Sequence, residues 1–191
     1  MKQPFNMILP AFHYLAENAF ESDLERQEIR KKGELMQKNR EISEESLLLG
    51  AQYIPSTPEM SPPLSIEWIN NEIGYGVFTT TLIQKDSFVC EYVGTIRKND
   101  SRRYLEPLND YCYQYPIVDE RGVNYIIDST SGNLSRFINH SFSPNLRPVY
   151  AFKEGYLHLI FLAIKDIQPH TQLLFNYGKN YWYLRGQPFP L

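Results

Sequence analysis

Two segments of the chain carry polar residues of types that can bind a ligand or take part in a reaction. Residues 132–145 place Asn139, His140 and Ser141 among Phe, Ile and Pro side chains. Polar groups enclosed by apolar ones need hydrogen-bond partners, so this Asn-His segment is expected to hold a polar group. Residues 176–178, with Tyr177 at their centre, follow an apolar run further along the chain. We expect this tyrosine to supply the second half of the same site.

Aromatic residues are plentiful, with 14 tyrosines and 11 phenylalanines in the sequence. Tyr111, Tyr113 and Tyr115 alternate along one predicted strand, so their side chains are expected to share a face. Such a face either packs into a core or forms an aromatic wall for a cation. The Gly-Tyr-Gly motif at residues 74–76 is typical of a tight turn, or of backbone that approaches a ligand closely.

The elements that must position these residues fall into a helical part and a mostly β part. Residues 10–52 are rich in Ala, Leu, Glu, Gln, Arg and Lys, with Gly33 as interior breaker, which predicts one or two amphipathic helices. Residues 53–64 contain four prolines and are predicted to form an extended linker. Beyond the linker, short apolar runs alternate with Gly, Asn, Asp and Pro, which is typical of short strands. Strands are predicted at residues 65–70, 75–79, 87–96, 111–117, 125–127, 146–152, 157–164 and 172–176, and a small helical insert at residues 99–109.

Length and charge fit one soluble globular domain with an appendage. The net charge of the 191 residues is −3; residues 1–60 hold 7 Lys and Arg against 10 Asp and Glu, and residues 61–191 hold 12 against 12. We therefore predict no direct binding of nucleic acid. No apolar run approaches the roughly 18 residues of a membrane span, and no signal peptide opens the chain, so an intracellular protein without membrane attachment is expected. Cys90 and Cys112 are not in a zinc-binding pattern, and they favour a reducing compartment.

Residues 65–183 resemble the SET-domain protein-lysine methyltransferases, on the Asn-His segment, the Tyr177 motif and the blocks that precede them. The Arg-Phe-Ile-Asn-His block and the Phe-x-Tyr-Gly ending are similar to the histone-lysine branch, although its zinc-binding cysteine modules are missing. The resemblance implies a mostly β fold of the β-clip type, with small curved sheets and a knot-like crossing, preceded by the N-terminal helical segment. The expected domains are a helical segment at residues 1–52, a Pro-rich linker at 53–64, the SET domain at 65–183 and a C-terminal tail at 184–191.

The resemblance also implies a role for individual residues. Tyr177 is the expected catalytic residue, and no metal is expected. The side chains expected to line the channel for the substrate lysine are Tyr92, Tyr115, Phe175 and Tyr181. The residues expected to bind S-adenosylmethionine (SAM) are Gly74, Tyr75, Gly76, Tyr113, Arg136, Phe137, Asn139 and His140. In the family, phenylalanine at the position of Phe175 permits higher methylation states, so di- or trimethylation is expected.

The expected function is SAM-dependent N-methylation of protein lysines, with histone tails as substrate. This would place the protein in the nucleus or on the chromatin of a eukaryotic cell, including a host cell. The chain has His170-Thr171-Gln172-Leu173 where the family usually has Gly-Glu-Glu-Leu, and Asn176 where it usually has Asp. A catalytically silent SET-fold interaction module is therefore an alternative. A methyltransferase of a non-histone protein is a second one, because residue content does not separate it from an enzyme that acts on histones. The N-terminal helices would pack against the core or mediate a homodimer, and the aromatic tail, or a partner, would close the channel.

Overall fold

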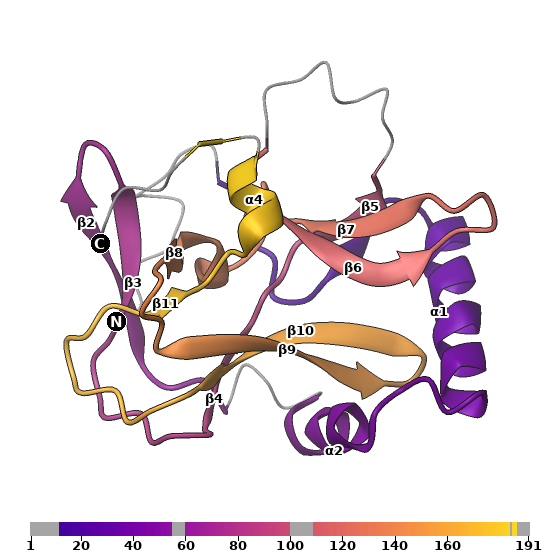
Figure 1. Ribbon diagram of the computed structural model, residues 1–191, viewed down its shortest axis with the longest axis horizontal. Helices are drawn as coiled ribbons and strands as arrows, with labels where there is room; N and C mark the ends of the chain where they lie inside the picture. The colour runs from indigo at the N-terminus through magenta and orange to yellow at the C-terminus, as the bar shows by residue number, and fades with distance from the viewer. Residues whose placement is uncertain (1–11, 55–59, 100–108, 184, 187–191) are drawn as a thin grey trace. The chain divides into compact units, whose positions relative to one another are not determined.

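The computed structural model describes residues 12–54, 60–99, 109–183 and 185–186 (Figure 1). The chain divides into two compact units, which we describe separately. Unit 1 comprises the residues up to Ile54, together with Tyr92–Arg136 and Tyr150–Leu159. Unit 2 comprises Pro55–Glu91, Phe137–Val149 and the residues from Ile160 onward. Each unit is therefore assembled from segments that lie far apart in the sequence.

The structure is mostly β, as predicted. Its helices are α1 (Asp23–Lys38), α2 (Glu44–Tyr53) and α4 (Lys179–Tyr183), with a 3-10 turn, η3, at Leu134–Phe137. Its strands are β1 (Ala19–Phe20), β2 (Leu64–Asn70), β3 (Gly74–Thr79), β4 (Phe88–Glu91), β5 (Thr95–Lys98), β6 (Cys112–Val118), β7 (Asn124–Asp128), β8 (Asn139–His140), β9 (Leu146–Lys153), β10 (Tyr156–Ala163) and β11 (Leu174–Phe175). They form small sheets of two to four strands, as predicted for this fold.

Unit 1 is built on a four-stranded sheet with the strand order β1-β5-β7-β6. Strands β5 and β7 pair antiparallel, with Thr95 opposite Asp128, and β6 pairs antiparallel with the other edge of β7. Strand β1 adds to β5 in parallel through Ala19 and Phe20. The largest side chains in the core of this unit have less than 2% exposure, and they are Ile29, Ile96, Tyr115, Tyr125, Ile127 and Leu159.

The N-terminal helices α1 and α2 belong to unit 1 and pack closely on the hairpin formed by β9 and β10. Helix α1 begins after the N-cap residue Ser22, whose hydroxyl accepts the N–H of Glu25 at 3.2 Å, as N-cap serines do. A Cβ atom on Gly33 of α1 would lie 2.0 Å from the carbonyl oxygen of Gly155. A Cβ atom on Gly50 of α2 would likewise lie 1.8 Å from the carbonyl oxygen of Phe152. Both glycines therefore permit contact between helix and hairpin backbones.

Replacing Gly33 by alanine is expected to destabilise the protein, although the same change in a free helix would stabilise it by about 1 kcal/mol. The new methyl group would overlap the Gly155 carbonyl group, which is backbone and cannot rotate away. Overpacking of this kind costs about 1–3 kcal/mol. Urea denaturation would measure the change, with Lys31→Ala on the exposed side of α1 as the control. An unchanged or higher unfolding free energy for Gly33→Ala would contradict the close helix–hairpin contact.

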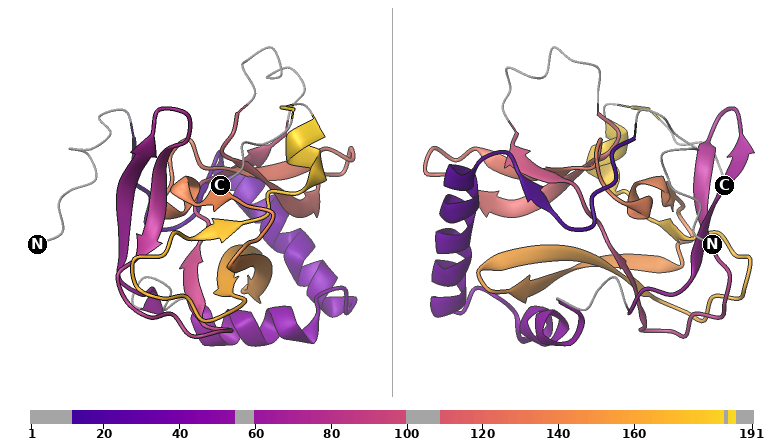
Figure 2. Two further views of the ribbon diagram at one scale, coloured as in Figure 1. Left: turned by 60° about the vertical axis from the view of Figure 1, so that its left-hand side comes forward. Right: turned by 180° about the vertical axis from the view of Figure 1, so that it is seen from behind.

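Unit 2 contains the β2–β3 hairpin, which Figure 2 shows in purple and magenta. Strands β4 and β10 pair antiparallel, with Cys90 opposite Phe161. The two-residue strands β8 and β11 pair in parallel. The core of this unit includes side chains without exposed surface, among them Val77, Val89, Ile160, Phe161 and Leu173. Within the described ranges, no helix is long and apolar enough to cross a membrane.

The structure corrects some predicted elements. Helix was predicted from residue 10, but residues 12–22 contain a bridge at Tyr14 and the short strand β1, because they pair with strands of unit 1. The predicted strand at residues 87–96 is two strands, β4 and β5, which are separated by Tyr92-Val93-Gly94. Residues 100–108 of the predicted helical insert at 99–109, and most of the tail at 184–191, lie outside the described residues. The packing of α1 and α2 in unit 1 agrees with the first of their two predicted roles, and a homodimer stays a prediction.

Candidate functional site

The Asn-His segment and the Tyr177 motif lie side by side in unit 2. Strands β8 and β11, both labelled in Figure 1, pair with Asn139 opposite Leu174 and His140 opposite Phe175. The N–H of Ser141 continues the pairing by donating to the carbonyl oxygen of Phe175 at 3.1 Å. Two segments separated by more than thirty residues in the sequence thus share one hydrogen-bonded ladder.

Asn145 locks the same two segments together, a role that the sequence analysis did not assign. Its side-chain N–H donates to the carbonyl oxygen of Gln172 at 2.7 Å, and its side-chain oxygen accepts the N–H of Leu174 at 2.8 Å. Its own backbone N–H donates to the carbonyl oxygen of Leu174 at 3.1 Å. With 4% of its surface exposed, Asn145 is a buried amide that satisfies the backbone leading to Tyr177.

Tyr177 is held at both its backbone and its phenol. Its N–H donates to Nδ1 of His140 at 3.1 Å, and its hydroxyl donates to the carbonyl oxygen of Ile138 at 2.8 Å. Its ring packs on Phe175 and Tyr181, with ring centroids 4.6 and 4.7 Å away. Because the phenol proton points to a carbonyl group, the lone pairs of the phenol oxygen remain available to accept a further hydrogen bond.

His140 is buried, with 6% exposure, and its ring is neutral at pH 7. Burial lowers the pKa of this imidazole, and its Nδ1 already accepts the N–H of Tyr177, so the ring proton lies on Nε2. The rings of Phe142, Tyr177 and Trp182 surround it at 4.6, 5.4 and 5.0 Å. The buried Nε2 atom has no hydrogen-bond partner among the residues that the structure describes. A buried donor of this kind is suited to a ligand acceptor.

The Gly-Tyr-Gly motif lies against Asn139. The side-chain N–H of Asn139 donates to the carbonyl oxygen of Tyr75 at 3.0 Å. Gly74 has a φ of 79°, which favours glycine, and a Cβ atom there would meet nothing within 4 Å. A Cβ atom on Gly76 would lie 2.7 Å from Nε2 of Gln172, a buried donor without a hydrogen-bond partner in the described part of the chain. Gln172 therefore belongs with Gly76 and Asn139 in this site. From the sequence it was notable only as a departure from the family pattern.

Other aromatic side chains extend these contacts. Phe137, predicted to bind the cofactor, is 9% exposed and lies 6.2 Å from the ring of Tyr75, whose other neighbour is Trp68 at 5.1 Å. Helix α4 places Tyr181 and Trp182 against Tyr177, with Trp182 stacked parallel at 6.2 Å. The buried indole Nε1 of Trp182 also lacks a hydrogen-bond partner within the described ranges. The sequence alone gives no indication of a site role for Trp182, because one aromatic residue in a tail carries no local signal.

The remaining predicted site residues lie in unit 1, where Tyr92 and Tyr113 are neighbours. Tyr92 is 5% exposed, and its hydroxyl donates to the carbonyl oxygen of Tyr111 at 2.8 Å. Its ring lies 5.9 Å from that of Tyr113, which in turn lies 6.5 Å from the ring of Tyr150. Burial raises the pKa of Tyr113 and of Tyr150, so both phenols are protonated at neutral pH.

Tyr113 and Tyr115 lie on one face of β6, as predicted, because they alternate with the exposed Gln114 and Pro116. Tyr115 in β6 has no exposed surface, and its hydroxyl accepts the N–H of Leu157 at 3.0 Å, as expected of a core tyrosine. Tyr111 precedes β6 and is 36% exposed. Tyr111 therefore lies outside the strand face on which it was predicted, and the channel role of Tyr115 stays a prediction.

Arg136 lies between two aromatic rings of unit 1. Its guanidinium carbon is 3.8 Å from the ring centroid of Tyr111 and 4.9 Å from that of Phe12. One of its terminal nitrogens donates to the carbonyl oxygen of Thr130 at 2.5 Å. These contacts are cation–π and hydrogen-bonding interactions within the protein. Its predicted contact with SAM stays a prediction.

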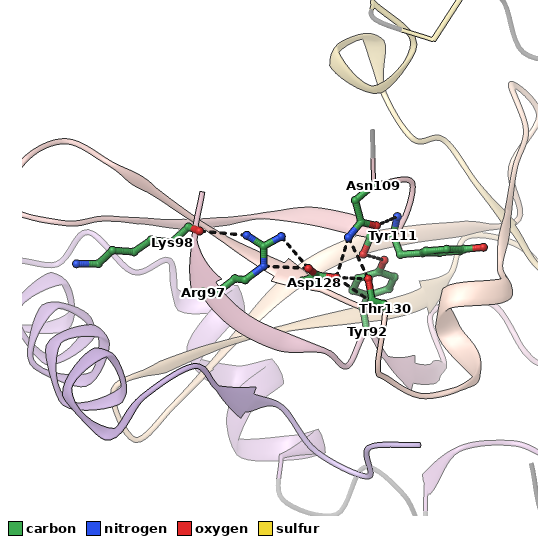
Figure 3. Close-up of polar contacts among 7 residues, drawn as sticks. All are labelled: Tyr92, Arg97, Lys98, Asn109, Tyr111, Asp128 and Thr130. Carbon is green, nitrogen blue, oxygen red and sulfur yellow. Dashed lines mark hydrogen bonds and ion pairs between the residues drawn. The ribbon is translucent and has the colours of Figure 1, made fainter. Parts of the chain in front are cut away.

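Asp128 is the centre of a polar network at the end of β7, shown in Figure 3. One carboxylate oxygen accepts Nε and a terminal nitrogen of Arg97 at 2.9 and 2.7 Å. The other accepts the side-chain N–H of Asn109 at 3.0 Å and the hydroxyl of Thr130 at 2.7 Å. Asn109 in turn accepts the N–H of Tyr111 at 2.9 Å. Through Tyr111, the network reaches the hydroxyl of Tyr92.

Replacing Asp128 by asparagine is expected to lower the unfolding free energy by about 3 kcal/mol at pH 7, because it leaves Arg97 largely buried without its counter-ion. Burial alone would raise the pKa of Asp128, but the Thr130 and Arg97 donors more than offset this, so its pKa is lowered. Its stabilising contribution is therefore complete above the ordinary aspartate pKa of about 4, and is lost as pH falls through the lowered value. Denaturation at pH 7 and at acidic pH would measure both effects, with Asp166→Asn in unit 2 as the control. Equal stability of Asp128→Asn and wild type at pH 7 would contradict this account.

Among the residues that the structure describes, no group of three or more His, Cys, Asp or Glu side chains could hold a metal ion.

Residues 74–178 of this chain match a protein-family model described as "SET domain". The chain belongs to the SET-domain family. The match begins at Gly74 and ends with Gly178, directly after Tyr177.

Known SET-domain proteins are similar over a limited part of their length. The mouse "Histone-lysine N-methyltransferase EHMT1" is 34% identical over 123 residues, which are 62% of this chain and 9% of that protein. The "Histone-lysine N-methyltransferase EZH2" of Chaetomium thermophilum is 33% identical over 116 residues, which are 56% of this chain and 8% of that protein. This chain therefore spans less than a tenth of the length of these curated relatives.

The structure also resembles solved SET-domain structures. One of them is "ctPRC2 in an autoinhibited conformation bound to S-adenosylmethionine", with a TM-score of 0.53 and 28% identity, over 63% of this chain and 16% of that chain.

The part of the chain that the SET-domain family model matches does not include Phe12, Tyr181 or Trp182. The family match thus accounts for Tyr177 and His140, but not for the aromatic side chains that contact them from α4.

Proposed function

We propose that this SET-domain protein is a SAM-dependent protein-lysine N-methyltransferase that acts on histone tails. The relatives named above are histone-lysine N-methyltransferases, and one similar structure is described as bound to SAM. The observation that carries the proposal is the pairing of β8 with β11, since it fixes Tyr177 on His140 and Ile138. Such an arrangement is suited to a reaction that depends on alignment.

The polar groups of unit 2 fit SAM. Buried N–H donors on His140, Gln172 and Trp182 lack partners in the described part of the chain, and SAM offers carboxylate, hydroxyl and ring-nitrogen acceptors. We propose that SAM is held by Gly74, Tyr75, Gly76, Phe137, Asn139 and His140, and that Tyr113 is a further contact. When bound, SAM supplies an electrophilic methyl group.

Tyr177 would orient the substrate amine. Its phenol proton is donated to Ile138, so its oxygen can accept a hydrogen bond from the lysine amine and direct the nitrogen lone pair. We assign it no role as a general base, because a tyrosine of ordinary pKa near 10 is protonated at neutral pH. Holding the reacting atoms about 3–3.5 Å apart in line can supply roughly 7–11 kcal/mol of the barrier reduction.

Aromatic rings would favour both the reactant and the product forms of the substrate lysine. Burial in an apolar channel lowers the pKa of a lysine and so favours the neutral, nucleophilic amine. The faces of aromatic rings also accommodate the methylated cation. Phe175, without a hydroxyl group, leaves room for second and third methyl groups, and we propose di- or trimethylation on this basis. The channel residues we propose are Tyr92, Tyr115, Phe175 and Tyr181.

The departures from the family pattern are compatible with activity. Asn176 accepts the N–H of Gly178 through its side-chain oxygen at 2.9 Å, a bond that aspartate would also make. His170 has a φ of 62°, a left-handed conformation in which the glycine usual in the family is unstrained. These substitutions therefore preserve the backbone that leads to Tyr177, which favours an active enzyme over a silent interaction module.

The test is transfer of a radiolabelled methyl group from SAM to core histones and to proteins of a whole-cell extract. We expect label on a histone lysine, which mass spectrometry would locate, together with its methylation state. Label found only in the extract would establish a non-histone substrate. The absence of label from every protein, with SAM still raising the melting temperature, would overturn the proposal in favour of an interaction module.

A further inference from the structure

Residues 12–22, here called the N-terminal strap, form hydrogen bonds with the backbone of two glycines elsewhere in unit 1. At the first, the N–H of Leu15 donates to the carbonyl oxygen of Gly132 at 2.8 Å. The N–H of Gly132 donates back to the carbonyl oxygen of His13 at 3.1 Å. Gly132 opens the segment that leads to Arg136, so the strap fixes the start of that segment.

The second glycine is Gly94, two residues after Tyr92. Its N–H donates to the side-chain oxygen of Asn18 at 3.0 Å, and its carbonyl oxygen accepts the N–H of Ala19 at 3.0 Å. A Cβ atom on Gly94 would lie 2.5 Å from the carbonyl oxygen of Asp128. The strap therefore fixes the turn that follows Tyr92 directly against the end of β7.

The strap also supplies a side chain to the stack around Arg136. Phe12, which is 5% exposed, lies 4.9 Å from the Arg136 guanidinium group, and Tyr111 lies 3.8 Å from it. Tyr111 accepts the hydroxyl proton of Tyr92 at its carbonyl oxygen, at 2.8 Å. A continuous set of contacts thus runs from Phe12 through Arg136 and Tyr111 to Tyr92.

We propose that the N-terminal strap is a positioning element for Tyr92. Through Phe12 and Arg136 it fixes Tyr111, and the carbonyl group of Tyr111 in turn fixes the Tyr92 phenol. The inference rests on the proposed function in one respect: Tyr92 matters to turnover as a wall of the lysine channel. It assigns Arg136 to positioning, in place of direct contact with SAM. It also implies that residues outside the 74–178 family match are needed for full activity.

The test compares Phe12→Leu with Phe12→Tyr in the full chain. Leucine removes the ring that faces Arg136, whereas tyrosine keeps it. His13→Ala is the matched control, because the exposed His13 side chain is lost while its bonded carbonyl group is kept. We expect kcat with the protein substrate to fall about 10-fold in Phe12→Leu, since small misplacements near a reacting centre cost up to about 100-fold. The Kd for SAM should change less than about 2-fold, and Phe12→Tyr should restore kcat.

Amide hydrogen exchange provides a readout that does not depend on activity. Below the melting temperature, Phe12→Leu is expected to exchange faster in residues 109–115 and 130–136, with residues 160–175 of unit 2 unchanged. Unchanged exchange in the first two segments would overturn the proposal, as would faster exchange throughout the chain, which indicates a general loss of stability. If wild type transferred no methyl group, the proposed function would fail, and the exchange pattern would still decide whether the strap positions Tyr111.

Discussion

Tyr177→Phe is expected to lower kcat for methyl transfer at least about 100-fold, because the amine loses the hydroxyl group that orients it. The ring contacts with Phe175, Tyr181 and Trp182 do not involve the hydroxyl group and should persist. Loss of the bond to the Ile138 carbonyl should cost only about 1 kcal/mol of stability. Single-turnover kinetics and calorimetric titration with SAM would separate these effects, and the Kd for SAM should change less than about 3-fold.

Tyr183→Phe is the matched control for this prediction. Tyr183 lies in α4, close in sequence to Tyr181, but it is 87% exposed. The kcat of Tyr183→Phe should equal that of wild type, which would show that removal of a phenol hydroxyl group by itself has no effect. Wild-type kcat in Tyr177→Phe would refute the proposed role of Tyr177, whatever the control shows.

Most strands were predictable because local sequence determines them. Strands β3 and β9 are short apolar runs bounded by turn residues, and their observed limits differ by one residue from those predicted. Helices α1 and α2 were predictable from composition, and serine caps mark their starts at Ser22 and Ser43. These signals act within a few residues, so they are readable without knowledge of the fold.

The strap and the turn after Tyr92 were not predictable, because tertiary contacts decide both. Residues 12–22 have no strong strand pattern, and β1 forms only because β5 offers a free edge. The strand predicted at residues 87–96 breaks because Gly94 packs against the Asp128 carbonyl group at a distance that no other residue permits. A contact between residues 94 and 128 leaves no local trace in the sequence.

The candidate site shows the same division. Asn139, His140 and Tyr177 stand in recognisable motifs, and the β8–β11 pairing does bring their two segments together. Asn145, Gln172 and Trp182 were missed as site residues, because single polar or aromatic residues become informative only when their neighbours are known. The buried N–H groups of Gln172 and Trp182 are visible only in the structure.

His140→Ala is expected to have the second large effect, on both SAM binding and stability. The substitution removes the acceptor for the Tyr177 N–H and leaves a cavity among Phe142, Tyr177 and Trp182. A buried ring removed in this way costs about 3 kcal/mol, and an unpaired buried N–H adds to the loss. We expect the Kd for SAM to rise at least about 10-fold, measured calorimetrically below the melting temperature, because Nε2 is lost as a donor.

The titration of His140 makes the stability of the protein depend on pH. Its pKa in the folded protein lies below the ordinary value of about 6.5, because burial disfavours the charged ring. At a pH between these two values, the unfolded chain binds a proton at this residue and the folded protein does not. The unfolding free energy must therefore fall as pH drops from about 6.5 through the lowered pKa, and this contribution is constant above pH 7.

His140→Phe isolates this contribution, since phenylalanine keeps an aromatic ring at the centre of the cluster but cannot titrate. The difference in unfolding free energy between wild type and His140→Phe should shrink as pH falls from 7 to 5, because only wild type is destabilised by protonation of this ring. A difference that stays constant over this range would mean that burial does not lower the pKa of His140.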